Sequence, residues 1–177
     1  MKLKIAAIAA GLVASFAPVA LADGSLDAVN ADLAKLQVDF QSAHDTLLAD
    51  AQKLQSDAAL VKPGNKDQAK AAIQADWQQL KSDFQAKHTV MQADWQQLHT
   101  DFQAARAAKA GTKADRQALK QAEQQMRSTF QAGRAQVHQA VEAAKAAIKA
   151  ARAAGAPISA SDANKVSDAN AVPPTNP

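Results

Sequence analysis

The chain has 177 residues, of which 47% are hydrophobic and 21% charged, with no cysteine and a formal net charge of +3 at pH 7. The lack of cysteine excludes a disulfide framework and a thiolate metal site, although export would permit disulfides. Ala, Gln, Lys and Asp are abundant while Gly and Pro are few, which is typical of long helices and predicts an all-α protein.

Residues 1–22 have the pattern of a secretory signal peptide. Lys2 and Lys4 precede an apolar run that ends in the small-x-small cleavage signal Ala20-Leu-Ala22. The run is too short and too rich in Ala for a stable span, and no later stretch approaches the ~20 apolar residues of a transmembrane helix. We therefore expect an exported chain, periplasmic or secreted, that begins near Asp23.

Helix-breaking residues divide the rest of the chain into three helices. Ser25 is the expected N-cap of a first helix that runs to about Val61 and stops at Lys62-Pro-Gly-Asn65. Asn65 with Gln68 resembles a capping box, which predicts a second helix from residue 66 to about 109.

The break between the second and third helices is the weaker one. Gly111-Thr112, with Asp115 in the first turn, is expected to end the second helix and to cap a third over 112–154. Because a Gly costs only ~1 kcal/mol inside a helix, a continuous or kinked rod over 66–154 is the alternative. The polar, Pro-rich residues 156–177 are expected to form a disordered tail.

An 18-residue repeat dominates the second helix. Ala75-Asp-Trp-Gln-Gln-Leu-Lys-Ser-Asp-Phe-Gln85 returns as Ala93-Asp-Trp-Gln-Gln-Leu-His-Thr-Asp-Phe-Gln103. At about 100° per residue, such a repeat completes about five turns, so equivalent residues of the two copies lie on the same face of the helix. We interpret the seam of that face as core, with an exposed aromatic strip for sugars, unfolded client proteins or a membrane as the alternative. The seam residues are Trp77, Leu80, Phe84, Trp95, Leu98 and Phe102.

Fainter copies of this pattern in the first and third helices predict three related helical units. A seam that averages 3.6 residues per turn runs nearly straight, which favours long, weakly coiled helices. The expected fold is an antiparallel three-helix bundle or an elongated coiled-coil-like hairpin. Its apolar core is thin for its length, so self-association or a protein partner would complete it.

Charged residues flank the seams in lines. Asp residues stand one position before the Trp or Phe positions, in pairs seven apart, and the second helix carries Asp76, Asp83, Asp94 and Asp101. The third helix carries a basic line of Lys113, Lys120, Arg127 and Arg134. Because the first and third helices of an up-down-up bundle are parallel, we interpret the lines as interhelical salt bridges that set the register. A carboxylate ladder for divalent cations or a basic client is the alternative, but residues seven apart lie ~10 Å apart along a helix.

Two histidines, His44 and His88, occupy the same repeat position. This position also accepts Arg, which favours a polar interruption of the seam over a metal or haem ligand. The sequence has no GxSxG, HExxH or Gly-rich phosphate loop, and its only glutamates are Glu123 and Glu142.

These observations favour an exported, non-catalytic protein without a cofactor, a small-molecule substrate or a nucleic-acid partner. We expect it to act by protein contact or self-association, as a structural or interaction protein of the holdase or scaffold type. The alternative is a metal- or haem-binding helical module that uses His44, His88 or the Asp line.

Overall fold

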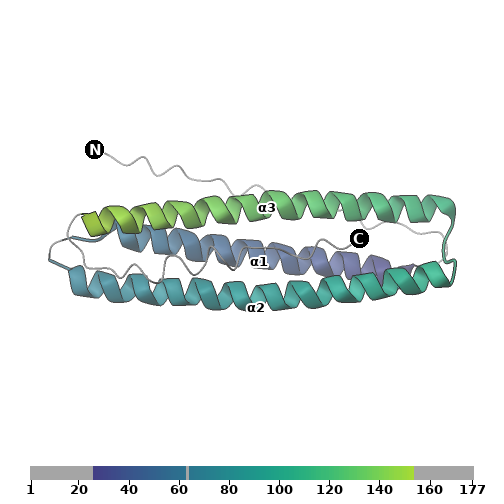
Figure 1. Ribbon diagram of the computed structural model, residues 1–177, viewed down its shortest axis with the longest axis horizontal. Coiled ribbons are helices and arrows are strands. Elements are labelled where there is room, and N and C mark those ends of the chain that lie inside the picture. Colours follow the sequence, from purple (N-terminus) through teal and green to yellow (C-terminus); the bar gives the residue numbers. More distant parts are fainter. Residues whose placement is uncertain (1–25, 63, 154–177) are drawn as a thin grey trace.

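The computed structural model describes residues 26–62 and 64–153, which form three α-helices and no strand. These are α1 (Asp27–Ala59), α2 (Lys66–Ala107) and α3 (Lys113–Ala153). Figure 1 shows three long helices side by side, with the two turns at opposite ends. The predicted all-α bundle is confirmed, and the alternative of a continuous rod through the second and third helices is wrong. The predicted signal peptide, the N-cap at Ser25 and the predicted tail lie outside the described residues.

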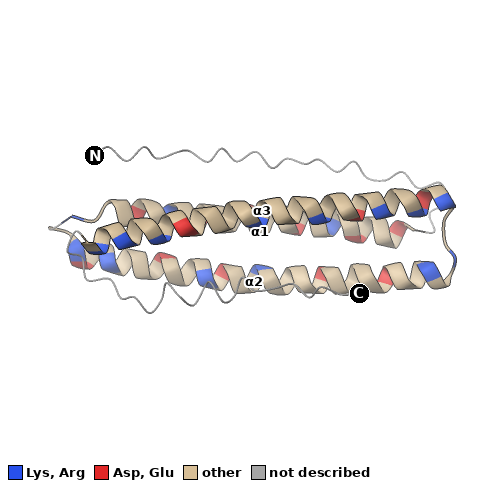
Figure 2. Cartoon of the chain, turned by 45° about the horizontal axis from the view of Figure 1, so that its top comes forward, with Lys and Arg blue, Asp and Glu red and all other residues tan. Residues whose placement is uncertain are grey.

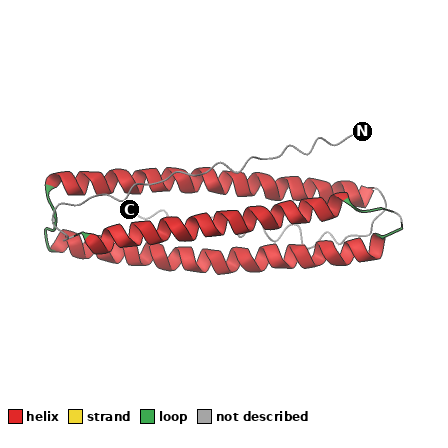
Figure 3. Ribbon diagram, turned by 180° about the vertical axis from the view of Figure 1, so that it is seen from behind, coloured by secondary structure: helices red, strands yellow, loops and turns green. Residues whose placement is uncertain are grey.

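The first helix is the element on which the other two assemble. α1 packs against both α2 and α3. It lies behind and between them in Figure 1 and in front of them in Figure 3. By contrast, α2 and α3 meet mainly through long side chains, such as the edge-to-face contact of Trp95 and Phe130 at 5.7 Å between ring centroids.

The core has two apolar halves. One half joins the later part of α1 to the start of α2 and the end of α3, and its large buried residues are Leu47, Leu48, Leu54, Ile73, Trp77, Leu80, Val141 and Ile148. The other half joins the start of α1 to the end of α2 and the start of α3, and it contains Leu26, Val29, Leu33, Leu36, Leu98, Leu119 and Met126. Within the described residues, none of the helices has the length and apolar content to cross a lipid bilayer.

The turn between α1 and α2 differs in detail from the sequence prediction. α2 begins at Lys66 as expected, but the Asn65 side chain does not cap it. Asn65 Oδ1 instead accepts a hydrogen bond of 2.7 Å from the Lys62 backbone N–H, and its amide group donates one of 3.2 Å to the Leu60 carbonyl. The predicted capping box with Gln68 is therefore wrong, because Asn65 stabilises the turn before the helix.

The turn between α2 and α3 contains the predicted cap of the third helix, and this cap is a reciprocal capping box. Thr112 Oγ1 accepts a hydrogen bond of 3.2 Å from the Asp115 backbone N–H, and Asp115 Oδ2 accepts one of 2.9 Å from the Thr112 N–H. Lys109 and Gly111 both have positive φ, at 52° and 70°. Such conformations cannot continue an α-helix, so the chain reverses here.

Candidate functional site

The Asp lines of α1 and α2 face each other across their antiparallel seam. Four side-chain contacts join them: Asp32 with Asp101, Asp39 with Asp94, Asp50 with Asp83 and Asp57 with Asp76. These four Asp residues of α1 are separated by seven, eleven and seven residues. Their partners on α2 have the same separations in the reverse direction of the chain. We call these eight residues the acidic seam.

Two lysines of α1 neutralise part of this charge. Lys35 Nζ lies 2.7 Å from Asp39 Oδ2 and also pairs with Asp94 of α2. Lys53 makes the corresponding ion pairs, including one with Asp76. The predicted pairing of the Asp line of the first helix with the basic line of the third is wrong for Asp39 and Asp57, which form their ion pairs with lysines of α1 itself. The ion pairs between helices join these lysines to Asp94 and Asp76 of α2.

Burial changes the proton affinity of the acidic seam. Burial, together with the contact to the Asp83 carboxyl, raises the pKa of Asp50 to about 6. Burial also raises the pKa of Asp32 and of Asp76, whereas the hydrogen bond from Lys35 lowers the pKa of Asp39. These shifts favour a carboxyl–carboxylate pair that shares a proton, since two adjacent carboxylates resist joint ionisation.

Proton sharing also suits the buried oxygen atoms. The Oδ2 atoms of Asp32, Asp50, Asp76 and Asp94 are buried without a hydrogen-bond partner. In Asp32 and Asp50, whose pKa values burial raises, such an oxygen favours the protonated carboxyl, because a buried charge without a partner is costly. Among the described residues, no group of three or more His, Asp or Glu side chains is arranged to hold a metal ion.

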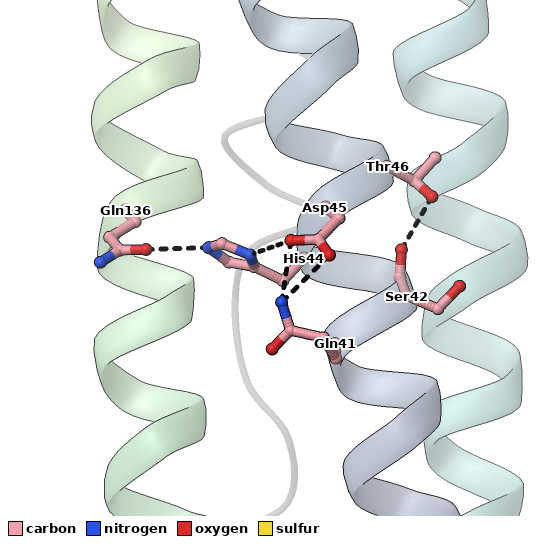
Figure 4. A network of polar contacts seen from close by, with 6 residues as sticks. All are labelled: Gln41, Ser42, His44, Asp45, Thr46 and Gln136. Atoms are coloured by element: carbon pink, nitrogen blue, oxygen red, sulfur yellow. Dashed lines mark hydrogen bonds and ion pairs between the residues drawn. The ribbon is translucent and has the colours of Figure 1, made fainter. Parts of the chain in front are cut away.

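Along α1, His44 lies between the residues of the two apolar halves of the core, and Figure 4 shows its ring pointing toward Gln136 of α3. Its side chain is 2% exposed, with Nε2 2.9 Å from Gln136 Oε1 of α3 and Nδ1 3.0 Å from Asp45 Oδ1. His88 is exposed and stacks on Phe84 at 6.2 Å. His44 thus uses both ring nitrogens within the bundle, and the two histidines lie in different surroundings.

The seam of α2 is buried unevenly, although its sequence is repeated. Leu80 and Leu98 are each 2% exposed and Trp77 is 5% exposed. Three further seam residues are partly exposed, namely Phe84, Trp95 and Phe102. On α3, Phe130 is also partly exposed and packs against Trp95. We call this side of the bundle, where α2 and α3 meet through their side chains, the α2/α3 face.

Basic residues border the α2/α3 face along α3. Successive residues of an α-helix are rotated by about 100° around its axis. By this measure, all eight Lys and Arg residues of α3 lie within a sector of about 60° of the helix circumference. This sector adjoins α2, because the Arg127 guanidinium lies 5.4 Å from the centre of the Trp95 ring. Figure 2 shows Lys and Arg recurring along α3, with few acidic residues among them.

A second basic row borders the face along α2. It lies next to the Trp and Phe positions, within a sector of about 20°, and consists of Lys70, Lys81, His88, His99 and Arg106. The stacking of His88 on Phe84 places this row beside the aromatic seam. The α2/α3 face therefore has a partly exposed aromatic centre between two basic rows.

The lysines of the acidic seam and the basic row of α2 each follow a repeat in the sequence that the sequence analysis did not identify. Ala31-Asp-x-x-Lys-Leu-Gln-x-Asp39 returns 18 residues later as Ala49-Asp-x-x-Lys-Leu-Gln-x-Asp57. This internal repeat of α1 matches the period of α2 and includes Lys35 and Lys53. The basic row of α2 has steps of eleven, seven, eleven and seven residues, which is the same period.

Comparison with known proteins finds no matching family model, no similar curated protein and no similar solved structure.

Proposed function

We propose that this chain is an exported, non-catalytic protein that binds other protein chains through the α2/α3 face, as a holdase-type chaperone or scaffold. The observation that carries the proposal is the partial exposure of Phe84, Trp95 and Phe102, which pack against the core clusters on the side where α2 and α3 meet mainly through side chains. Export is inferred from the sequence of residues 1–22 alone.

Aromatic side chains suit a binding surface of this kind. They offer a large apolar area at low cost in side-chain entropy, and they accept many apolar partners. The surrounding Lys and Gln side chains keep such a face hydrated when it is empty. The acidic seam is less suited to binding or catalysis, because its carboxyl groups lie between two packed helices.

The proposal is tested by mixing the chain from Asp23 to Pro177 with a reporter enzyme that aggregates on heating. We expect the protein to suppress light scattering by the reporter, and Trp95→Ala to weaken the suppression. The matched control is Val38→Ala, which removes an apolar side chain that is 66% exposed on α1. Circular dichroism verifies that each variant stays folded.

Two outcomes contradict the proposal. One is the absence of suppression at several-fold molar excess over the reporter. The other is an equal loss of suppression in Trp95→Ala and Val38→Ala, because apolar exposure anywhere on the bundle would then be sufficient.

A further inference from the structure

The helices occupy three of the four positions of a four-helix bundle. In such a bundle each helix packs against two neighbours and lies diagonally across from the remaining one. α1 packs against both α2 and α3, while α2 and α3 meet mainly through Trp95 and Phe130, as diagonal helices do. The position opposite α1, over the α2/α3 face, has no helix among the described residues.

The charges around that position are mainly positive. Four of the five acidic residues of α2 belong to the acidic seam and face α1. On α3, Asp115 is engaged in the Thr112 cap, Glu123 lies 2.7 Å from Arg127, and Glu142 lies 2.9 Å from Lys145. The two basic rows that border the α2/α3 face therefore carry an excess of positive charge.

A helix that occupies this position must match both the basic rows and the aromatic residues between them. A helix with an apolar stripe would cover the partly exposed aromatic residues, as amphipathic helices do in hydrophobic grooves. Acidic residues on both sides of that stripe would meet the basic rows of α2 and α3, in the manner of flanking charges in helical bundles. An apolar stripe with basic flanks would be repelled by both rows.

We infer that the α2/α3 face docks an acidic amphipathic helix of a partner protein, which completes a four-helix bundle. This inference rests on the proposed function and names the chemical class of its partner. Lys70, Lys81 and Arg106 carry the charge of the α2 row, and His88 and His99 between them offer ring N–H donors, so the partner helix carries Asp or Glu at steps of seven and eleven residues along the flank that meets α2.

The test uses three synthetic peptides of about 25 residues, long enough to form a helix on the bundle. The first has a Leu stripe with Glu on both flanks, the second has the same stripe with Lys flanks, and the third is a scrambled version of the first. Binding to the chain from Asp23 to Pro177 is followed by fluorescence anisotropy of labelled peptide. We expect the Glu-flanked peptide to bind one to one, with a gain in helicity, and the other two to bind at least tenfold more weakly.

Charge reversal locates the binding site. Lys120→Glu, in the α3 row, is expected to weaken binding of the Glu-flanked peptide by about five- to tenfold at low ionic strength, with a smaller effect at high salt. Lys62→Glu makes the same charge change in the turn between α1 and α2, and it is expected to leave binding nearly unchanged. Trp95→Ala reports on the aromatic centre and is expected to weaken binding at both salt concentrations.

Several results overturn the inference. Equal binding of the Glu- and Lys-flanked peptides would show that the basic rows do not select the partner. Strong binding of phosphatidylglycerol vesicles or heparin without binding of the Glu-flanked peptide would assign the face to a lipid surface or a polyanion. A dimer seen by light scattering and unaffected by the peptide would assign it to a second copy of this chain. In each case aggregation suppression that depends on Trp95 would leave the proposed function standing.

Discussion

Replacement of Asp50 by Asn tests the physical account of the acidic seam. The pKa of Asp50 rises from an ordinary value of 3.8 to about 6 because the carboxyl is buried beside Asp83 and Asp76. Asn removes the charge but keeps the shape, and its amide group donates a hydrogen bond to the Asp83 carboxylate without needing a proton. We expect Asp50→Asn to be more stable than the wild type at neutral pH.

The magnitude follows from the linkage between pKa and stability. A rise of this size corresponds to about 3 kcal/mol at neutral pH as an upper limit. Asp50 remains partly exposed, so solvent screening reduces the expected gain to about 1 kcal/mol. Asp32 and Asp76 act in the same direction, since their pKa values are also raised.

The sign of the pH dependence is determined by the raised pKa. Below about pH 4 the Asp50 carboxyl is protonated in both the folded and the unfolded chain, and its contribution to stability is fully present. As the pH rises from about 4 to about 6, the unfolded chain releases the proton first, so the folded state loses this stability. Asp39 and Asp57 have lowered pKa values, so their effect on the pH dependence is the opposite. The stability that they give the folded state is lost as the pH falls below about 4.

The assay is urea unfolding followed by circular dichroism at about pH 7.5 and about pH 4.5, where roughly two-thirds of the Asp50 contribution is recovered. The difference between wild type and Asp50→Asn isolates Asp50 from the histidines, which are present in both proteins. Asp45→Asn is the matched control, because the hydrogen bond from Gln41 and the contact with His44 lower the pKa of this exposed carboxyl. It is expected to lose stability at neutral pH. An Asp50→Asn variant no more stable than wild type at about pH 7.5 would refute the reasoning.

Three further changes probe packing and capping by urea unfolding. Trp77→Ala is expected to cost ~3–5 kcal/mol, and Trp95→Ala only ~1–2, because Trp77 is 5% exposed and its repeat partner is partly exposed; equal losses would contradict the assigned burial. Gly133→Ala places a Cβ 2.5 Å from Phe40 Cζ and is expected to cost ~1–2 kcal/mol, although Ala has the better helix propensity. Adding Phe40→Leu should recover part of the lost stability. A Gly133→Ala variant more stable than the wild type would show that α1 and α3 are less tightly packed. Thr112→Ala removes the α3 cap and should cost ~0.5–2 kcal/mol, whereas an unchanged midpoint would deny the cap a role.

The sequence predicts the helices well because their ends have local causes. The Thr112 and Asp115 capping box, the turn around Gly64 and the apolar seams depend on residues close together in the chain. Even there, the side chain of Asn65 finds partners in the turn and not in the helix. This choice depends on the turn conformation, which residue identity alone does not determine.

The acidic seam could not be derived from charge complementarity, which assigns Asp lines to a basic partner. In the structure the antiparallel register of α1 and α2 brings two Asp lines together, and the apolar seams determine that register. Lys35 and Lys53, and proton sharing among the carboxyls, make the arrangement tolerable. The internal repeat of α1 is the sequence feature that predicts two equivalent clusters.

The central place of α1 has a consequence for the order in which the protein assembles. Its contacts with α2 follow a short turn, whereas its contacts with α3 join distant residues, as in the hydrogen bond between His44 and Gln136, 92 positions apart. Loop-closure entropy favours the nearer pairing, so the hairpin of α1 and α2 is expected to form first. Until α3 docks, the hairpin lacks the α3 residues of the core cluster that contains Trp77, among them Val141 and Ile148. The slowest event of folding is therefore expected to be the docking of the basic third helix.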